Sequence, residues 1–184
     1  MADLAALPPM ERRSLRCREA DIARVSNILG LSLPQRAYGT SRKGNLHTLW
    51  LGPDEWLLLA ENSPADQFAA LEAALSNLPM SIVDISHRQV AFELVGDDVE
   101  TCLASGCPLD LAQAAFPVGA CARTLFHKAE IILWRKSAAC FHIEVWRSFA
   151  SYVEQLLYMG SEDFEPNPSS GHPSQPRLVE EAHP

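Results

Sequence analysis

Residues 82–103, IVDISHRQVAFELVGDDVETCL, contain both of the apolar periods that decide the fold. Val90, Phe92 and Leu94 alternate with residues of other character, which is typical of a strand that buries one face. After Asp97 the apolar residues have the spacing of one helix face; they are Val99, Cys102 and Leu103. The stretch therefore predicts a strand followed directly by a short helix.

The same change of period recurs along the chain. Strands are expected at 15–17, 46–50, 56–60, 82–84, 90–94, 122–126, 130–134 and 141–145. Helices are expected at 22–29, at 63–78 behind the capping signal Ser63-Pro64-Ala65-Asp66, at 97–106 and at 148–160. This order predicts an α+β fold with helices packed on a mainly antiparallel sheet, and its first six elements match a ferredoxin-like unit.

The composition limits the kind of protein. With 47% hydrophobic and 21% charged residues among 184, the chain has enough apolar surface for the core of one ordinary domain. No apolar run approaches the ~20 residues of a membrane span, and residues 1–4 lack the basic start of a secretion signal. We therefore expect a soluble, cytoplasmic protein with no membrane contact. The net charge of -8 repels a phosphate backbone and disfavours nucleic acid as a partner.

Charge and proline content predict the domain boundaries. Residues 160–184 hold five acidic residues against Arg177 alone, together with five prolines. Such a segment buries too little apolar surface to offset its conformational entropy, so we expect a disordered tail. Residues 1–13, with two adjacent prolines, are expected to be flexible as well, which leaves 14–159 as a single α+β domain.

Cysteine and histidine form no recognisable metal or redox motif. The cysteines include no C-x-x-C pair and are expected to be buried free thiols; they are Cys17, Cys102, Cys107, Cys121 and Cys140. Only Cys107, which follows a helix end and precedes Pro108, is a candidate for a reactive thiol. The histidines of the folded unit are scattered singly, which argues against a metal site; they are His47, His87, His127 and His142.

The densest polar cluster is Asp84-Ile85-Ser86-His87-Arg88. Neighbouring side chains of a strand point to opposite faces, so an adjacent Ser-His pair does not normally face itself. A turn in which Asp84 or Ser86 bonds local backbone amides is favoured, and a catalytic acid is the alternative.

The segment Gly39-Thr40-Ser41-Arg42-Lys43-Gly44 has the glycines and adjacent cations that an anion-binding loop needs. It lacks the Gly-Lys-Ser/Thr ending of a P-loop, and no capped helix follows it. A mobile hairpin loop is favoured, and an anion contact through Arg42 and Lys43 is the alternative.

Aromatic residues exceed what a core of this size requires. Some strand faces opposite the expected helices have no element assigned to cover them, and the chain has four tryptophans. Because Trp and Arg are enriched at protein interfaces, we regard Trp50, Trp146 and Arg147 as candidate contacts to a partner. The chain is then a candidate subunit of a larger assembly.

Five segments resemble the gamma-subunit family of heterotetrameric sarcosine oxidase. They are LGPDEWLL (51–58), VDIS (83–86), LASGCPLDL (103–111), FPVG (116–119) with ARTL (122–125), and RSFASY (147–152). They occur in the family's order over nearly all of 14–159, and GCPLDL together with RSFA is fairly specific. A wider similarity links this family to the folate-binding aminomethyltransferases of glycine cleavage, whose α+β core agrees with the predicted order of elements.

The resemblance implies a role in a flavoenzyme complex. The family's holoenzyme oxidatively demethylates sarcosine to glycine and forms hydrogen peroxide and 5,10-methylenetetrahydrofolate. By the same resemblance, FAD, FMN, NAD and tetrahydrofolate belong to the alpha and beta subunits, and zinc belongs to the delta subunit. The gamma subunit is assigned no catalytic, cofactor-binding or metal-binding residue.

These observations lead to one hypothesis and two alternatives. The chain is expected to be a non-catalytic gamma subunit that assembles with alpha, beta and delta subunits and holds no cofactor itself. One alternative is a free-standing folate-binding module of the aminomethyltransferase type, with its anionic ligand held by Arg42, Lys43, Arg88 or Arg123. The other is the equivalent small subunit of an N-methylglutamate dehydrogenase.

Overall fold

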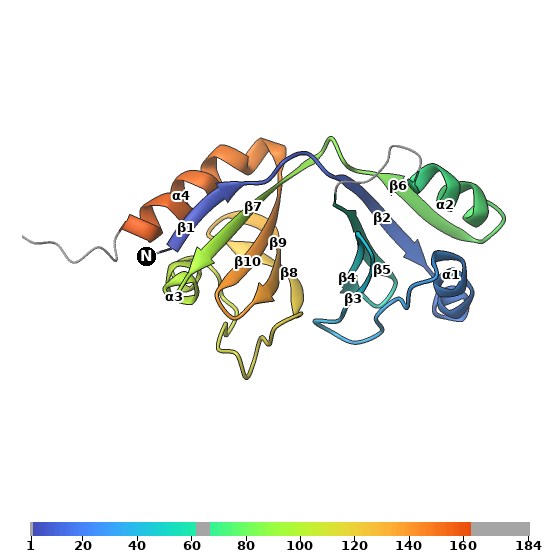
Figure 1. Ribbon diagram of the computed structural model, residues 1–184, viewed down its shortest axis with the longest axis horizontal. Helices are drawn as coiled ribbons and strands as arrows, with labels where there is room; N and C mark the ends of the chain where they lie inside the picture. Colours follow the sequence, from blue (N-terminus) through green and yellow to red (C-terminus); the bar gives the residue numbers. More distant parts are fainter. Residues whose placement is uncertain (1, 62–66, 163–184) are drawn as a thin grey trace, which may run out of the picture.

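A computed structural model describes residues 2–61 and 67–162 of the chain (Figure 1). Its described part contains two five-stranded sheets in which every pair of neighbouring strands is antiparallel. Sheet A has the order β1 (Ala2–Ala6), β7 (Gln89–Gly96), β10 (Cys140–Trp146), β9 (Ala129–Ser137) and β8 (Cys121–Phe126). Sheet B has the order β3 (Thr40–Lys43), β4 (Leu46–Gly52), β5 (Glu55–Ala60), β2 (Glu11–Cys17) and β6 (Met80–Asp84).

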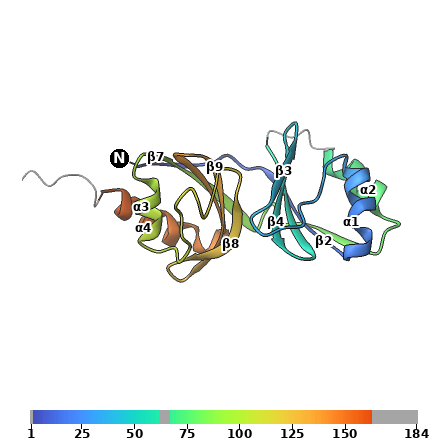
Figure 2. The same cartoon turned by 90° about the horizontal axis from the view of Figure 1, so that it is seen from below.

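Helices cover the outer face of each sheet, so the molecule has four layers along its long axis (Figure 2). Helices α1 (Ile22–Leu29) and α2 (Gln67–Leu75) pack on sheet B around the fully buried Trp56 and Phe68. Helices α3 (Val99–Ala104) and α4 (Ala150–Glu162) pack on sheet A around Phe126, Phe141 and neighbouring aliphatic residues. Short 3-10 turns, η1 (Glu19–Asp21) and η2 (Arg147–Phe149), precede α1 and α4.

The expected ferredoxin-like unit is present in sheet B. The elements β2, α1, β4, β5, α2 and β6 occur in this order along the chain, with β3 inserted before β4 as an additional edge strand, and the strands of the unit lie in the order β4-β5-β2-β6. Both β-α-β crossovers therefore skip one antiparallel neighbour, as in that motif. Gly30 ends α1 with φ of 63°, the left-handed conformation that glycine adopts most readily, as its place after the apolar stripe predicts.

A bent two-stranded ribbon connects the sheets (Figure 1). The chain passes from β1 in sheet A to β2 in sheet B, and it returns from β6 in sheet B to β7 in sheet A. Because β1 pairs with β7 and β2 pairs with β6, the two connections run side by side in opposite directions. Residues 7–10 and 85–88 lie at the bend.

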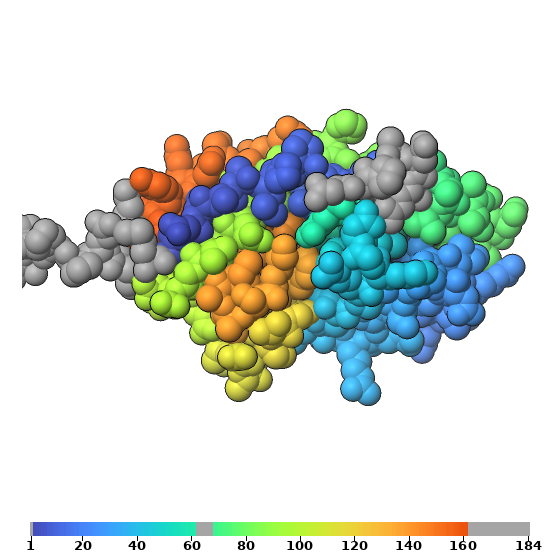
Figure 3. Space-filling view, viewed as in Figure 1, coloured from blue at the N-terminus to red at the C-terminus, as the bar shows by residue number. Residues whose placement is uncertain are grey.

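The facing surfaces of the sheets form a seam that is filled by apolar side chains. Its members are Leu49, Leu57, Leu59, Ile85, Cys121, Ile132 and Trp134, all at most 8% exposed. In Figure 3 the cyan atoms of sheet B abut the orange and yellow atoms of sheet A along this junction, where β4 contacts β8. The seam is a third cluster of buried residues between the two helix-covered cores.

The α+β class and the helix–strand order are confirmed, but the division into two sheets differs from the single sheet that we expected. Alternation along a strand shows that one face is buried, yet it does not show what covers that face. In β5 both faces are buried, one against α1 and α2 and the other against sheet A. Such a strand reads as a continuous apolar run, as residues 56–60 do.

Three boundaries differ from those expected. Residues 1–13 were expected to be flexible, but β1 pairs with β7 through residues 2–6 and buries Ala2, and β2 begins at Glu11. The expected mobile loop 39–44 contains strand β3, which ends in a turn at Gly44 with φ of 61°. Of the expected tail 160–184, residues 160–162 belong to α4 and the remainder lies outside the described residues, as does the capping signal at 63–66.

Within 2–61 and 67–162, no helix has the length and apolar character that crossing a bilayer requires.

The seam predicts a large stability cost for a cavity at Leu57, which is 1% exposed. Leu57→Ala is expected to lower the free energy of unfolding by about 2–5 kcal/mol, since the surrounding side chains of both sheets relax only partly. Urea unfolding followed by circular dichroism measures the change. Leu125→Ala, at a residue 48% exposed, is the matched control and is expected to change stability by less than about 0.5 kcal/mol. Equal losses in the two variants would contradict a packed seam.

Candidate functional site at the ribbon bend

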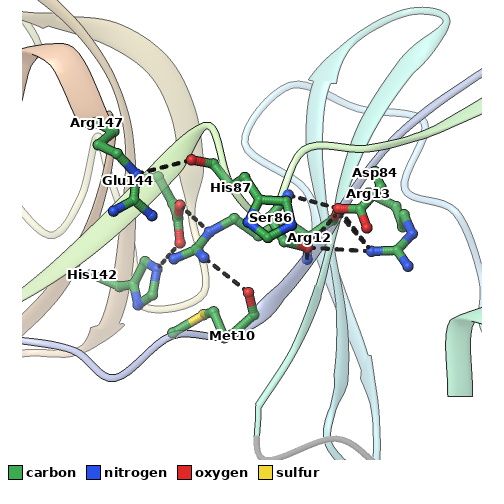
Figure 4. Close-up of polar contacts among 9 residues, drawn as sticks. All are labelled: Met10, Arg12, Arg13, Asp84, Ser86, His87, His142, Glu144 and Arg147. Atoms are coloured by element: carbon green, nitrogen blue, oxygen red, sulfur yellow. Dashed lines mark hydrogen bonds and ion pairs between the residues drawn. The ribbon is translucent and has the colours of Figure 1, made fainter. Parts of the chain in front are cut away.

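The bend of the ribbon is held by bonds between the backbone of Arg12 and the segment that follows β6 (Figure 4). The Ile85 amide donates to the Arg12 carbonyl at 3.1 Å, and the Arg12 amide donates to Ser86 Oγ at 2.9 Å. Ser86 Oγ also donates back to the Arg12 carbonyl at 3.3 Å. The hydroxyl thus replaces the strand ladder at the point where β2 and β6 stop pairing.

Asp84 and Ser86 form the turn that the sequence favoured. The Ser86 amide donates to Asp84 Oδ1 at 2.8 Å, which closes an Asx turn. Arg13 braces this turn, because its guanidinium lies 3.2 Å from Asp84 Oδ1 and 2.6 Å from Glu72 of α2. Burial alone would raise the pKa of Asp84, but the bonds from Ser86 and the Arg13 charge outweigh it and lower that pKa. Asp84 is therefore an ionised structural carboxylate at neutral pH.

A buried ion pair joins the two sheets next to this turn (Figure 4). Arg12 Nε of β2 lies 2.6 Å from Glu144 Oε2 of β10, and the exposed fractions of the two side chains are 2% and 0%. Arg12 also donates to the Met10 carbonyl at 3.0 Å. The second oxygen of Glu144 lies 2.7 Å from Nε2 of the fully buried His142. Both carboxylate oxygens are therefore occupied, as a buried charge requires.

Sequence reasoning did not single out Arg12 or Glu144. In FHIEVW, Glu144 stands between two apolar residues, so alternation assigns it to the solvent face of its strand. That face is covered by sheet B instead. The available signal was weak: a lone arginine and a lone glutamate on strands far apart in sequence, with nothing to indicate that the strands meet.

The Ser86-His87 pair does not have the arrangement of an acid–base site. Among the described residues, Ser86 Oγ contacts the Arg12 backbone and the Arg13 guanidinium, 3.3 Å away. His87 is exposed, and its carbonyl accepts a bond from Arg147 Nε at 2.9 Å. The Ser86 hydroxyl also bonds the Asp84 carboxylate, which in turn binds the Ser86 amide and the Arg13 guanidinium, so these groups brace the turn.

The residues that we regard as candidate contacts to a partner differ in their exposure to solvent. Trp146 is 39% exposed at the end of β10, and the Arg88 guanidinium stacks 4.5 Å from its ring centroid. Arg147 is exposed beside them. Trp50, in contrast, is only partly exposed and packs against the core between sheet B and α1. The structure thus brings Trp146, Arg147 and Arg88 together and leaves Trp50 apart.

The four cations considered for an anionic ligand do not converge. Arg42 and Lys43 are neighbours on β3, so their side chains point to opposite faces of the sheet. Lys43 Nζ lies close to Gly30, at the C-terminus of α1. Arg88 stacks on Trp146. Arg123 binds Glu55 across the seam, with NH2 2.5 Å from Oε1. The four cations therefore do not form one cluster around a common anionic ligand.

The described thiols are free, and all but one of them are buried. Cys107 is 6% exposed, and burial raises the pKa of its thiol against hydrogen bonds from Leu109 and Thr124. A raised pKa makes the thiolate scarce, so the structure contradicts the candidate reactive thiol. Cys17, Cys102 and Cys121 are also buried and free, and Cys140 is half-buried. Within the described ranges no three His, Cys, Asp or Glu side chains are grouped to hold a metal ion.

The buried pair predicts an asymmetry between single and double substitutions. Glu144→Gln leaves the Arg12 charge buried without a counter-charge and is expected to lower the free energy of unfolding by about 3–5 kcal/mol. The double variant Arg12→Met with Glu144→Met removes both charges and is expected to lose less than that single variant. Chemical denaturation of the purified chain gives both values. Arg18→Gln, which breaks an exposed pair with Asp21, serves as control with an expected loss below about 1 kcal/mol. A double variant as unstable as Glu144→Gln would contradict the role of charge burial.

The cross-sheet pair of Glu55 and Arg123 predicts a dependence of stability on pH. The hydrogen bond from Arg123 lowers the pKa of Glu55, partly opposed by burial and aided by the charges of Arg123, Arg16 and Arg88. A carboxylate whose pKa is lower in the folded state than in the unfolded state stabilises the protein at pH values above its unfolded-state pKa. That stabilisation is lost as the pH falls through the folded-state pKa. Glu55→Gln is therefore expected to cost about 1 kcal/mol at neutral pH, and the difference from wild type is expected to shrink below the ordinary glutamate pKa of 4.5.

Unfolding midpoints of both proteins across this pH range test the expectation. Glu19→Gln, at an exposed position in η1, is the control for loss of a negative charge. A difference that stays constant down to about pH 3 would show that the Glu55 pair is not ionised as described.

Comparison with known proteins relates this architecture to others. Residues 16–163 match the model of the family described as sarcosine oxidase, gamma subunit family. The sarcosine oxidase subunit gamma of Corynebacterium sp. (strain P-1) is 31% identical over 148 residues, which are 79% of this chain and 72% of that protein. The subunits gamma of Corynebacterium sp. (strain U-96) and Arthrobacter sp are 32% and 31% identical, and the matches span 56% and 60% of their lengths.

Solved structures give the same relation. The chain is similar to one in heterotetrameric sarcosine oxidase from Corynebacterium sp. U-96, in complex with pyrrole 2-carboxylate, with a TM-score of 0.83 and 26% identity over 89% of this chain and 85% of that chain. The glycine cleavage system aminomethyltransferase T from Bartonella henselae shares the fold, with a TM-score of 0.67 and 16% identity over 87% of this chain and 46% of that chain. With its fold and most of its length matched in this way, the chain belongs to the sarcosine oxidase gamma subunit family.

Proposed function

We propose that this chain is a non-catalytic gamma subunit of a heterotetrameric sarcosine oxidase, an enzyme that oxidatively demethylates sarcosine to glycine with formation of hydrogen peroxide and 5,10-methylenetetrahydrofolate. The observation that carries the proposal is the family match over residues 16–163 together with the structural likeness to a chain of a heterotetrameric sarcosine oxidase. The polar residues at the ribbon bend support it, because their side chains bind one another and hold the two sheets together.

The partners and cofactors follow from that role. The alpha, beta and delta subunits are the partners, and FAD, FMN, NAD, tetrahydrofolate and zinc are held by them rather than by this chain. The scattered positions of Arg42, Lys43, Arg88 and Arg123 favour this arrangement over a free-standing folate module. We place the assembly in the cytoplasm.

The contact surface that we propose runs from the end of β10 along α4. Half of the large apolar residues described as exposed lie in this short segment, and they are Trp146, Phe149, Tyr152, Tyr158 and Met159. Arg88 and Arg147 flank Trp146 and supply positive charge. Aromatic residues, Met and Arg are enriched at interface centres, where other charged residues are depleted. Trp50 contributes less, because it packs into the core of sheet B.

Co-expression with the alpha, beta and delta subunits tests the role. The chain is expected to co-purify with them in a fixed ratio, while the chain expressed alone is colourless, does not oxidise sarcosine and gives no heat with tetrahydrofolate. Flavin bound to the lone chain, or tetrahydrofolate heat, would contradict the subunit role. Oxidation of N-methylglutamate in preference to sarcosine by the complex would assign the chain to the related dehydrogenase.

Paired variants test the contact surface in the co-expressed complex. Trp146→Ala combined with Arg147→Glu is expected to reduce the recovered gamma subunit at least about tenfold, as loss of two central contacts would. Val95→Thr, at a residue 41% exposed at the opposite end of β7, is the matched control and is expected to leave recovery unchanged. Unfolding midpoints of both variants exclude a folding defect. Normal recovery of the Trp146 and Arg147 variant would place the interface elsewhere.

A further inference from the structure

Strand β1 forms a free edge of sheet A. It pairs with β7 on one side and has no neighbour among the described strands on the other. The Leu7 amide, just after β1, donates to the Ala91 carbonyl of β7 at 2.9 Å. Because backbone groups alternate between the two sides of an antiparallel strand, the amides and carbonyls of Leu4 and Ala6 point away from β7. In Figure 3 the dark blue atoms of β1 lie on the surface beside the orange atoms of α4.

The edge of β1 lacks the features that commonly stop a strand from pairing with another chain. Residues 2–6, ADLAA, contain no proline and no lysine, and their register with β7 has no bulge. Pro8 and Pro9 follow the strand and limit the length over which another strand could pair. Such an edge is a template for one short added strand.

An open groove of about 420 Å³ runs between this edge and α4. Its walls are Leu4 and Ala6 of β1 and Glu154, Gln155, Tyr158 and Met159 of α4. Tyr158 and Met159 are the most exposed large apolar side chains among the described residues, at 57% and 59%. Where a peptide is recognised by strand addition, backbone bonds to the edge supply affinity and an adjacent pocket accepts its alternate side chains. The edge of β1 and the groove together have this arrangement.

The charge of the groove indicates which kind of segment it accepts. Glu154 is exposed in its wall, and within residues 2–61 and 67–162 no ion pair joins it to a basic side chain. A carboxylate beside apolar side chains favours a segment that carries Lys or Arg next to apolar residues. Residues 163–184 of this chain are predominantly acidic and are therefore a poorer match. The groove also shares Tyr158 and Met159 with the proposed contact surface, so a partner seated on that surface reaches it directly.

We infer that an extended segment of a partner subunit adds to β1 as a further strand of sheet A. Its backbone exchanges hydrogen bonds with Leu4 and Ala6. Its apolar side chains lie in the groove against Tyr158 and Met159, and a Lys or Arg next to them pairs with Glu154. The inference rests on the proposed subunit role and specifies how the partner is held.

Hydrogen exchange, measured by mass spectrometry on the isolated chain and on the co-expressed complex, tests the strand addition. In the isolated chain the amides of Leu4 and Ala6 are expected to exchange rapidly, because they have no acceptor in sheet A. In the complex their exchange is expected to be at least about tenfold slower. The Leu125 amide points outward at the other edge of the sheet, on β8, and is the control whose exchange is expected to stay unchanged.

Substitutions in the same complex give a second test. Ala6→Pro removes the outward donor and keeps the bonds to β7, since proline is tolerated where the amide of an edge strand faces outward. It is expected to reduce the recovered complex at least about tenfold, and so is Glu154→Lys, which repels a basic segment. Leu125→Pro, at the outward position on β8, is the matched control and is expected to leave recovery unchanged. Unfolding midpoints of the isolated variants identify any folding defect, and the exchange of the wild-type complex does not depend on them.

The outcomes separate this inference from the subunit role. Unchanged exchange of Leu4 and Ala6 in a complex that the wild-type chain forms would overturn the strand addition alone, as would normal recovery of Ala6→Pro. Protection of these amides already in the isolated chain would also overturn it, because the groove would then hold residues of this chain or of a second copy. A wild-type chain that does not assemble would refute the subunit role, and the strand addition with it.

Discussion

The ion pair of Arg12 and Glu144 is the constraint on which the two-sheet architecture depends. Taking both charges out of water is costly, and the cost is offset only if each keeps its partner and its remaining hydrogen bonds. Those partners lie in different sheets and in both arms of the bent ribbon: Glu144 in β10, Met10 before β2, and Ser86 after β6. An arrangement of the sheets that separated Arg12 from Glu144 would leave a buried charge unpaired, so the pair favours the observed arrangement over others that the apolar seam alone would permit.

This constraint also explains how the chain uses its polar residues. Arg12 and His142 each bind one oxygen of Glu144 in the interior, and Asp84, Ser86 and Arg13 hold the turn beside them. Groups that could otherwise bind or activate a substrate are thus committed to structure. The surface at the end of β10 and along α4 exposes several aromatic side chains, and Arg88 and Arg147 flank Trp146, which is a composition enriched at protein interfaces.

Local sequence patterns predicted the helices and many of the strands. The division into two sheets and the burial of charged side chains depend on contacts between residues far apart in the sequence. The period-two run at 90–94, the helix stop at Gly30 and the Asx turn at Asp84 depend on a few adjacent residues, and all are present. Strand β1 was missed because ADLAA has little β-branched or aromatic character, and it is a strand because β7 and α4 lie beside it. Arg12 and Glu144 were missed because burial of a charge depends on a sheet that no local pattern reveals. The family, in contrast, was readable from the motifs at 103–111 and 147–152.

Native-state hydrogen exchange of the isolated full chain tests most directly whether the seam makes the two sheets one cooperative unit. The slowest amides of β4 and β5 in sheet B and of β9 and β10 in sheet A are expected to exchange with the same free energy of opening, equal to that of global unfolding. Exchange of one sheet at a lower free energy, while the other stays protected, would contradict the account, because it would mean that the protected sheet stands without the buried pair.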